Sequence, residues 1–170
     1  YNDHNGRYMM SLVTPQSTPV TIPANSVVST ALRTGVDSDV LVIWMGTNGL
    51  TVGGSFTPEQ LVDYHNMAIN YAATKKNIII GLHTGDLNSR KTQEEAMQKA
   101  FGLRYINLRK YMVEQGLVDA GLEPTQEDTE FINQGKCPPQ LLMDGTHFTT
   151  IGYTLVGKLV YQRGVSLGYW

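Results

Sequence analysis

Two short, almost wholly apolar runs constrain the fold of this chain more than any other feature. DVLVIWM occupies residues 39–45 and NIIIGL occupies residues 77–82. Neither run alternates between apolar and polar residues, which is typical of strands that are buried on both faces. Such strands belong to parallel sheets, because the helices that connect parallel strands cover both faces of the sheet. The two runs therefore predict an α/β fold.

Helical signals separate and follow these runs. Thr57 is a predicted N-cap, with Pro58 in the first turn and Gln60 three residues after the cap. The later predicted elements are a helix over 91–102, a strand over 104–108, a helix over 109–116 that ends at a glycine, and a last helix over 149–163. Strands and helices that alternate with short connections imply right-handed crossovers. The predicted fold class is therefore α/β, a three-layer α/β/α sandwich with a mainly parallel sheet.

The length of the chain fits a single domain. Its 170 residues, of which 41% are hydrophobic, are sufficient for one sizeable core. We therefore expect one domain over residues 1–170, with an α/β core over 39–170. Residues 1–38 are polar and turn-rich, with prolines among small residues, and they predict an irregular or extended N-terminal segment.

Composition excludes several classes of function. The formal net charge is −2, with no cluster of Lys and Arg, so we expect no nucleic-acid partner and no membrane partner. The apolar runs are also too short to span a bilayer. The one cysteine, Cys137, cannot form an intramolecular disulfide or a CxxC metal site, and we interpret it as an ordinary free thiol in a loop. The compartment is left open between extracellular, virion-associated and cytoplasmic.

Polar residues follow the predicted strands at the positions where ligands bind in parallel sheets. GTNG (46–49) follows the first strand, HTGD (83–86) follows the second, and DGTH (144–147) precedes the last helix. Because ligands bind beyond the carboxyl ends of the strands, we expect these loops to meet at one edge of the sheet. This edge is the predicted functional site.

Asp144 and His147 form the first candidate pair of catalytic residues. Histidine is the common general base near neutral pH, and a carboxylate on its second nitrogen fixes its tautomer and stabilises the imidazolium. Three residues apart in a turn with Gly145, the two side chains can form a hydrogen bond. The alternative is that Asp144 or Thr146 caps the last helix and His147 lies in its first turn.

Asn48 and Gly46 are the second candidate, as oxyanion or substrate-binding residues. Asn48 follows a buried strand, and its side-chain amide is a neutral donor of the kind that stabilises a developing negative charge. Gly46 and Gly49 keep its surroundings free of side chains. The alternative is a plain turn at the end of the strand, for which Asn-Gly is an ordinary choice.

In this order, the two motifs resemble those of the SGNH (GDSL-type) hydrolase superfamily. Gly46-Thr47-Asn48 is similar to its Gly-x-Asn block and Asp144-Gly145-Thr146-His147 to its Asp-x-x-His block. The resemblance covers residues 39–170. It implies a flavodoxin-like sheet and the hydrolysis of an ester, in which His147 is the base, Asp144 orients it and Asn48 is an oxyanion donor. The implied substrate is a small acyl ester or an O-acylated, often O-acetylated, saccharide, and no metal or other cofactor is expected.

The nucleophile of such a site is not identified in this chain. The Gly-Asp-Ser block of the superfamily is absent, and no serine before Asn48 follows Gly-Asp: Ser11, Ser17, Ser26, Ser29 and Ser38. The sequence also starts at Tyr1 without an initiator methionine or a signal peptide. We therefore expect the serine, and the first strand of the sheet, to come from an N-terminal segment outside this sequence or from a companion chain.

Two other classes of function remain as alternatives. The first is a non-catalytic carbohydrate-binding or structural module of a virion or adhesin that retains the fold. The second, a nucleotide-binding protein, has less support because GTNGLTVGG lacks both the GxGxxG spacing and the lysine of a P-loop.

The remaining candidate side chains have plainer interpretations. We interpret His83 as a loop histidine satisfied by backbone, His65 as a packing residue of a helix, and Trp44 as a core residue. Neither His65 nor His83 has a partner at the spacing of metal ligands, so we expect no metal site. The acidic stretch EPTQEDTE (123–130) predicts a solvated surface.

Overall fold

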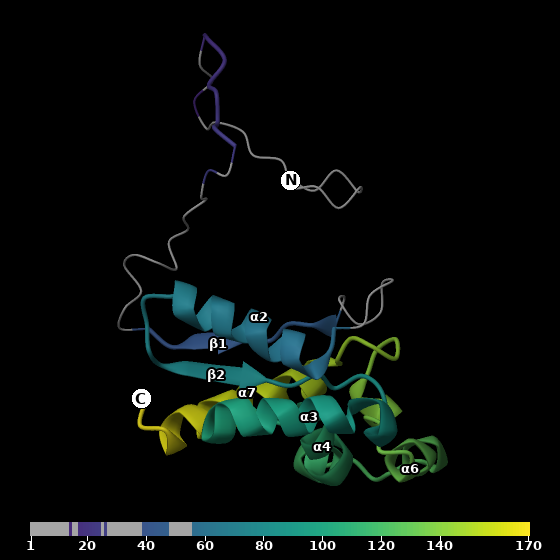
Figure 1. Ribbon diagram of the computed structural model, residues 1–170. Coiled ribbons are helices and arrows are strands. Elements are labelled where there is room, and N and C mark those ends of the chain that lie inside the picture. The colour runs from purple at the N-terminus through teal and green to yellow at the C-terminus, as the bar shows by residue number, and fades with distance from the viewer. Residues whose placement is uncertain (1–13, 15–16, 25, 27–38, 48–55) are drawn as a thin grey trace. The chain divides into compact units, whose positions relative to one another are not determined.

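The computed structural model of the chain describes residues 14, 17–24, 26, 39–47 and 56–170 (Figure 1). The chain divides into two compact units, Tyr1–Thr30 and Ala31–Trp170. In the first unit, the N–H and the hydroxyl of Ser26 both donate to the carbonyl of Pro23 and close a turn. The helices and strands below belong to the second unit. The single-domain organisation stays a prediction.

The sheet of the second unit is parallel. It contains β1 (Leu41–Ile43), β2 (Asn77–Ile80) and β3 (Tyr105–Ile106), in the order β1-β2-β3. The chain is therefore an α/β protein with a three-stranded parallel sheet, as its apolar runs predict. The strands are shorter than predicted, because the pairing between β1 and β2 ends at Ile43 opposite Ile79.

Helices make up most of the rest of the described chain. In chain order they are α2 (Pro58–Tyr71), α3 (Leu87–Phe101), η2 (Gly102–Arg104), α4 (Leu108–Tyr111), η3 (Met112–Gly116), α5 (Leu117–Ala120), α6 (Gln126–Asn133), η4 (Pro139–Leu141) and α7 (Thr150–Ser166). Thr57 and Gln60 form the predicted capping box of α2.

Two predicted helix boundaries are wrong. Helix α3 begins at Leu87 rather than residue 91, because Asp86 and Ser89 form a capping box. Gly116 does not end a helix: the chain continues through the π-helical segment η3 into α5. That helix ends at Gly121, whose left-handed backbone (φ 68°) is the usual C-terminal stop.

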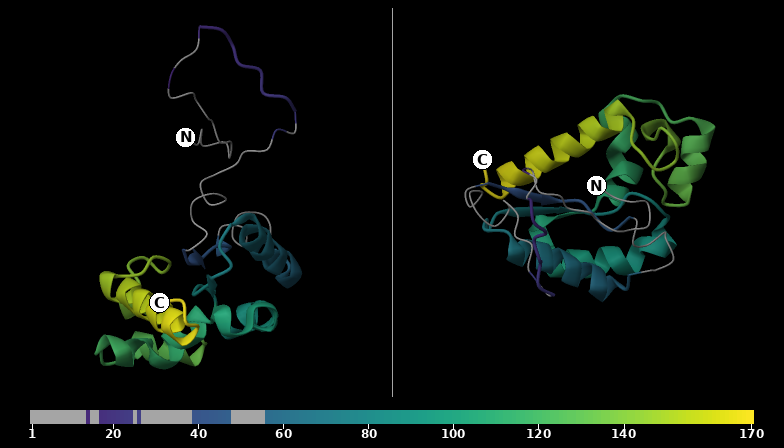
Figure 2. Two further views of the ribbon diagram at one scale, coloured as in Figure 1. Left: turned by 90° about the vertical axis from the view of Figure 1, so that its left-hand side faces the viewer. Right: turned by 90° about the horizontal axis from the view of Figure 1, so that it is seen from above.

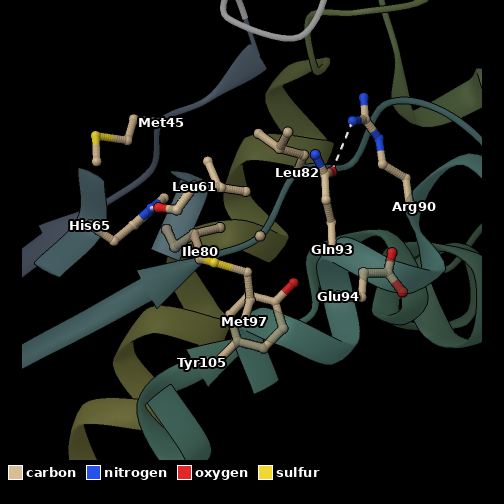
Figure 3. A pocket seen from close by; sticks show the side chains of 11 residues that line it. Met45, Leu61, His65, Ile80, Leu82, Arg90, Gln93, Glu94, Met97 and Tyr105 are labelled. Atoms are coloured by element: carbon tan, nitrogen blue, oxygen red, sulfur yellow. Dashed lines mark hydrogen bonds between the residues drawn. The ribbon is translucent and has the colours of Figure 1, made fainter. Parts of the chain in front are cut away.

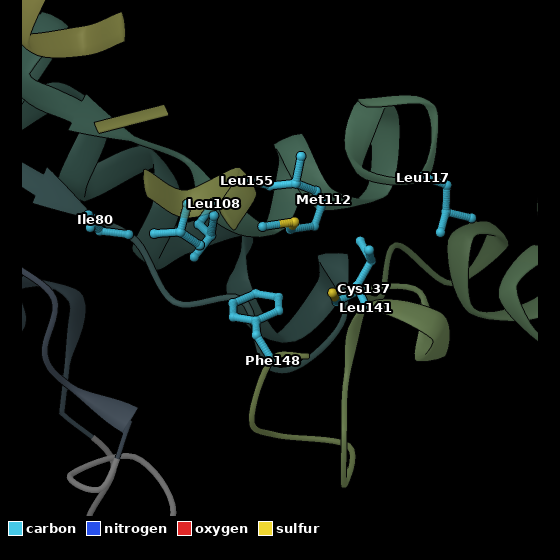
Figure 4. Close-up of a cluster of buried hydrophobic side chains, with 9 residues drawn as sticks. Ile80, Leu108, Met112, Leu117, Cys137, Leu141, Phe148 and Leu155 are labelled. Carbon is cyan, nitrogen blue, oxygen red and sulfur yellow. The ribbon is translucent and has the colours of Figure 1, made fainter. Parts of the chain in front are cut away.

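Apolar clusters cover both faces of the sheet. Ile79 packs with Leu61 of α2 and Met97 of α3, whereas its neighbour Ile80 packs with Leu108 of α4 and Leu155 of α7 (Figure 4). Successive residues of a strand point to opposite faces, so the two clusters lie on opposite sides of β2. Figure 2 shows α7 on one side of the strands and α2 with α3 on the other. This arrangement is compatible with a three-layer α/β/α layout.

Cys137 is a free thiol in the loop between α6 and η4, as predicted. The thiol is also buried: it lies in the cluster around Leu108 and is 4% exposed. Burial raises the pKa of Cys137 to about 12, which removes the thiolate near neutral pH.

The acidic stretch over 123–130 is exposed as predicted, with one exception, the fully buried Asp128. The carboxylate of Asp128 accepts hydrogen bonds from Thr125 and from the backbone and side chain of Gln140. It therefore ties α6 to η4 instead of facing solvent.

Candidate functional site

The Asp-Gly-Thr-His turn lies between η4 and α7. An isolated antiparallel bridge joins Leu142 to Phe148, and the N–H of Met143 donates to the carbonyl of His147 at 2.7 Å. Helix α7 is capped by Thr149, whose hydroxyl accepts from the N–H of Gly152. The alternative in which Asp144 or Thr146 caps this helix is therefore wrong.

Asp144 holds the ring of His147 directly. Its Oδ2 lies 2.7 Å from Nδ1 of His147, and its Oδ1 accepts the N–H groups of His147 at 2.8 Å and Thr146 at 3.1 Å. These hydrogen bonds, led by the backbone N–H of His147, lower the pKa of Asp144 to about 2. The carboxylate is consequently ionised at neutral pH.

The ionised carboxylate fixes the tautomer of His147. A carboxylate only accepts hydrogen bonds, so Nδ1 of His147 carries the hydrogen and Nε2 carries the lone pair in the neutral ring. The side chains of His147 and Asp144 are 68% and 57% exposed. Among the described residues, no hydroxyl or thiol donates to Nε2 of His147. Chemically, the pair can take a proton from a group that approaches Nε2.

His83 connects this turn to the sheet. It lies three residues after β2, is 6% exposed, and its Nε2 donates to the carbonyl of Thr146 at 2.6 Å. The predicted backbone partner of His83 is therefore confirmed, and the HTGD and DGTH loops meet as expected. The ring of His83 also packs against Phe148, with ring centroids 4.2 Å apart, and against Trp44 at 5.9 Å.

The segment after β1 borders an apolar cavity. Gly46 has a φ of 120°, and a Cβ added to it would lie 2.9 Å from Leu61 Cδ1, so the position suits glycine alone. The cavity has a volume of about 600 Å³, within the range of small-molecule pockets, and is lined by Trp44, Met45, Gly46, Thr47, Phe56, Leu61, Tyr64, Met67 and Ala68. Asn48 lies outside the described residues.

A second cavity lies between α2, α3 and the sheet, and is too small for a substrate. Its volume is about 10 Å³, room for one water molecule (Figure 3). His65, in its wall, is fully buried, which confirms the packing interpretation. Nδ1 of His65 donates to the carbonyl of Leu61 at 2.8 Å, and Nε2 has no hydrogen-bond partner.

The described part of the chain contains no group of three or more His, Cys, Asp or Glu side chains that could hold a metal ion. None of its helices combines the length and the apolar character that a membrane span needs.

Of the predicted site residues, the structure brings Asp144 and His147 together and places Gly46 beside the apolar cavity. Sequence reasoning missed two contributions, the hydrogen bond from His83 to the turn and the packing of Phe148 beneath it. The available signal for His83 was its place directly after a buried strand.

Comparison with known proteins adds no relative, since no protein-family profile, curated protein or solved structure matches the chain.

Proposed function

We propose that this chain carries the acid–base half of a serine-type ester hydrolase of the SGNH kind. The substrate class is a small acyl ester or an O-acylated saccharide. The observation that carries the proposal is the Asp144–His147 pair, in which a carboxylate holds Nδ1 and leaves Nε2 open to solvent. The parallel sheet with apolar clusters on both faces, and the loops gathered after its strands, support a three-layer flavodoxin-like fold.

The proposed reaction uses His147 twice. A serine hydroxyl attacks the acyl carbonyl carbon while Nε2 of His147 takes the hydroxyl proton. The carbon–oxygen bond to the alcohol then breaks, and the alcohol oxygen takes that proton from Nε2. Water repeats the two steps, which releases the carboxylic acid and restores the serine. Asp144 remains ionised throughout and stabilises the imidazolium that forms in each step.

The other parts of the site are assigned by position. Asn48 and the backbone of Gly46 are proposed to stabilise the oxyanion, because they come five and three residues after the end of β1 in the sequence. Of the serines that the structure describes in the second unit, Ser89 belongs to the capping box of α3 and Ser166 donates to the carbonyl of Arg163. Neither contacts His147. The serine is proposed to come from sequence outside this chain, because no serine before Asn48 follows Gly-Asp.

A fluorophosphonate probe tests this function, because it reacts covalently with an activated serine. The purified protein is treated with the probe and its intact mass is measured, with His147→Gln (H147Q) as the matched control. Labelling that H147Q abolishes supports the esterase. A labelled species heavier than this 18.8 kDa chain, or a labelled companion, locates the serine outside it. A label on the chain itself would identify one of its own serines as the nucleophile.

The second candidate function is a non-catalytic carbohydrate-binding or structural module of a virion or adhesin. The observation that favours it is that Nε2 of His147 has no hydroxyl partner among the described residues. Absence of labelling in a folded sample, together with a measured affinity for acylated oligosaccharides, would establish this candidate and refute the esterase.

A further inference from the structure

His83 has contacts with both chain neighbours of the candidate base. Its Nε2 donates to the carbonyl of Thr146, which precedes His147, at 2.6 Å. Its ring packs at 4.2 Å between centroids against Phe148, which follows His147 and is 1% exposed. One side chain after the end of β2 therefore contacts the backbone of the residue before His147 and the side chain of the residue after it.

The other hydrogen bonds of this turn are local. Asp144 accepts from Thr146 and His147, and Met143 donates to His147, so these bonds set the shape of the turn. They do not set its position on the sheet. Among the described residues, the turn over 143–147 has one hydrogen bond to a residue outside 141–149, and it is the bond from His83.

An exposed pair such as Asp144–His147 needs such support. Both side chains are more than half exposed, and exposed ion pairs contribute little to the order of the groups that form them. A catalytic base, however, works only when its reacting nitrogen is held close to the productive position. Two buried rings next to the turn, those of His83 and Phe148, are the fixed points available to His147.

Packing alone does not explain a histidine at position 83. A carbonyl only accepts, so Nε2 of His83 carries the hydrogen, and burial lowers its pKa and favours the neutral ring. Nδ1 is then a buried acceptor, and it has no hydrogen-bond partner. A phenyl ring would fill the same space without an unpaired nitrogen. What histidine adds is the donor to Thr146.

We infer that His83 is a positioning residue of the candidate site, which places the imidazole of His147 at the edge of the sheet by binding the carbonyl of Thr146. A role of His83 in catalysis rests on the proposed function. The structural content of the inference, that the donor of His83 orders the Asp144–His147 hydrogen bond, holds independently of any activity and is tested independently.

Two substitutions separate the donor from the ring. His83→Phe (H83F) keeps the packing against Phe148 and Trp44 and removes the donor, whereas His83→Gln (H83Q) places an amide N–H near the position of Nε2. His65→Phe (H65F) is the matched control, because His65 is equally buried, also has an unpaired ring nitrogen, and lies on α2 away from the turn. Folding of each variant is checked by circular dichroism.

The first readout is the NMR signal of the hydrogen on Nδ1 of His147, in protein with ¹⁵N-labelled histidine. We expect H83F to broaden or remove this signal, and H83Q and H65F to retain it. The second readout is the rate of fluorophosphonate labelling, which we expect to fall about 10- to 100-fold in H83F and to recover in H83Q, as for other residues that orient a reacting group.

The two readouts test different claims: the NMR signal tests the role of His83, and the labelling tests the esterase. An unchanged Nδ1–H signal in folded H83F, or no recovery in H83Q, would overturn the role of His83 even if labelling occurs. Absence of labelling in the parent protein would refute the esterase, and the NMR comparison would still decide the role of His83. If H83F does not fold, His83→Asn takes its place, since its shorter amide does not reach Thr146 and the same loss of signal is expected.

Discussion

At the scale of single residues, Asp144 is unusual because it is exposed and yet strongly held in its ionised form. Its partners all lie within its own turn, where two backbone N–H groups and one imidazole converge on two oxygens. Gly145 permits this convergence, since its φ of 81° is one that side-chain-bearing residues rarely adopt. The local sequence Asp-Gly-Thr-His therefore encodes which groups pair within the turn, while the hydrogen bond from His83 to Thr146 keeps the turn in position.

Asp144→Asn (D144N) tests whether this carboxylate supports catalysis. The asparagine can still accept from the backbone, but it no longer stabilises an imidazolium or selects the Nδ1–H tautomer. In protein that includes the segment or companion chain supplying the serine, we expect kcat on p-nitrophenyl acetate to fall by roughly 10²- to 10⁴-fold with little loss of stability. Asp63→Asn, at an exposed position of α2, is the control and should change neither quantity. Equal activity of D144N and the parent would remove Asp144 from the mechanism.

At the scale of elements, α7 contains two glycines in opposite situations. A Cβ at Gly152 would lie 2.6 Å from Phe148 Cδ1 and 2.7 Å from the backbone carbonyl oxygen of Leu141, whereas a Cβ at Gly157 would meet no atom within 4 Å. Gly152 therefore allows the start of α7 to approach the turn that contains His147. Gly157 lies on the exposed side of the helix, where glycine has only its conformational cost.

Alanine at these two positions should consequently have opposite effects. We expect Gly152→Ala to lower the free energy of unfolding by about 1–3 kcal/mol, because the backbone at Leu141 cannot move aside cheaply. Gly157→Ala should raise it by about 0.5–1 kcal/mol. Urea unfolding of both variants measures the difference. If Gly152→Ala left the free energy of unfolding unchanged, α7 would pack less closely on the turn than it does in the structure.

The buried histidine of α2 predicts a dependence of stability on pH. Burial lowers the pKa of His65 in the folded chain, so above the unfolded value of about 6.5 both states are neutral and pH has no effect through this residue. Below that value the unfolded chain binds a proton that the folded chain does not. Stability therefore falls with pH until the folded pKa is reached.

The measurement is urea unfolding between pH 7.5 and pH 5 for the parent protein and H65F. We expect the free energy of unfolding to fall more steeply in the parent, by at most about 1.4 kcal/mol per pH unit for this histidine. Carboxylates contribute equally to both proteins and cancel in the comparison. If the free energy of unfolding had the same pH dependence in the parent protein and in H65F, His65 would be protonated in the folded chain or open to solvent.

Elements that depend on local chemistry could be predicted from the sequence, and those that depend on distant contacts could not. The capping box of Thr57 and Gln60 was predictable because both partners lie within one turn. Gly116 was misread as a stop: with no left-handed backbone, it lies against Leu141, 25 residues further along the chain, and a Cβ there would be 2.8 Å from Leu141 Cδ1. The spacing of apolar residues along a helix does not reveal contacts with residues so far along the chain.

At the scale of the whole molecule, the same distinction applies to the site. Asp144 and His147 were identified because their spacing is itself the motif. Their hydrogen bond joins two residues that are three positions apart in the sequence. The bond from His83 to Thr146 spans 63 residues, and no periodicity encodes it. The parallel sheet followed from its apolar runs, while its strand β1 lies at the edge of the described sheet with Val42 42% exposed.

Cys137 offers a measurement of the stability of the whole α/β unit. Its thiol is buried in the cluster that joins β2 to α4 and α7, and its pKa is raised to about 12. Because the thiolate is the reacting form, the native thiol should react with DTNB at neutral pH roughly 10³-fold or more slowly than the unfolded one. The rate at intermediate urea concentrations should then follow the population of the unfolded state, since the side chain packs in the core cluster with Leu108 and Leu155. Cys137→Ala is the control for non-specific reaction and should leave fluorophosphonate labelling unchanged. Fast reaction of the native protein would show that the thiol is accessible to solvent, contrary to its burial in the structure.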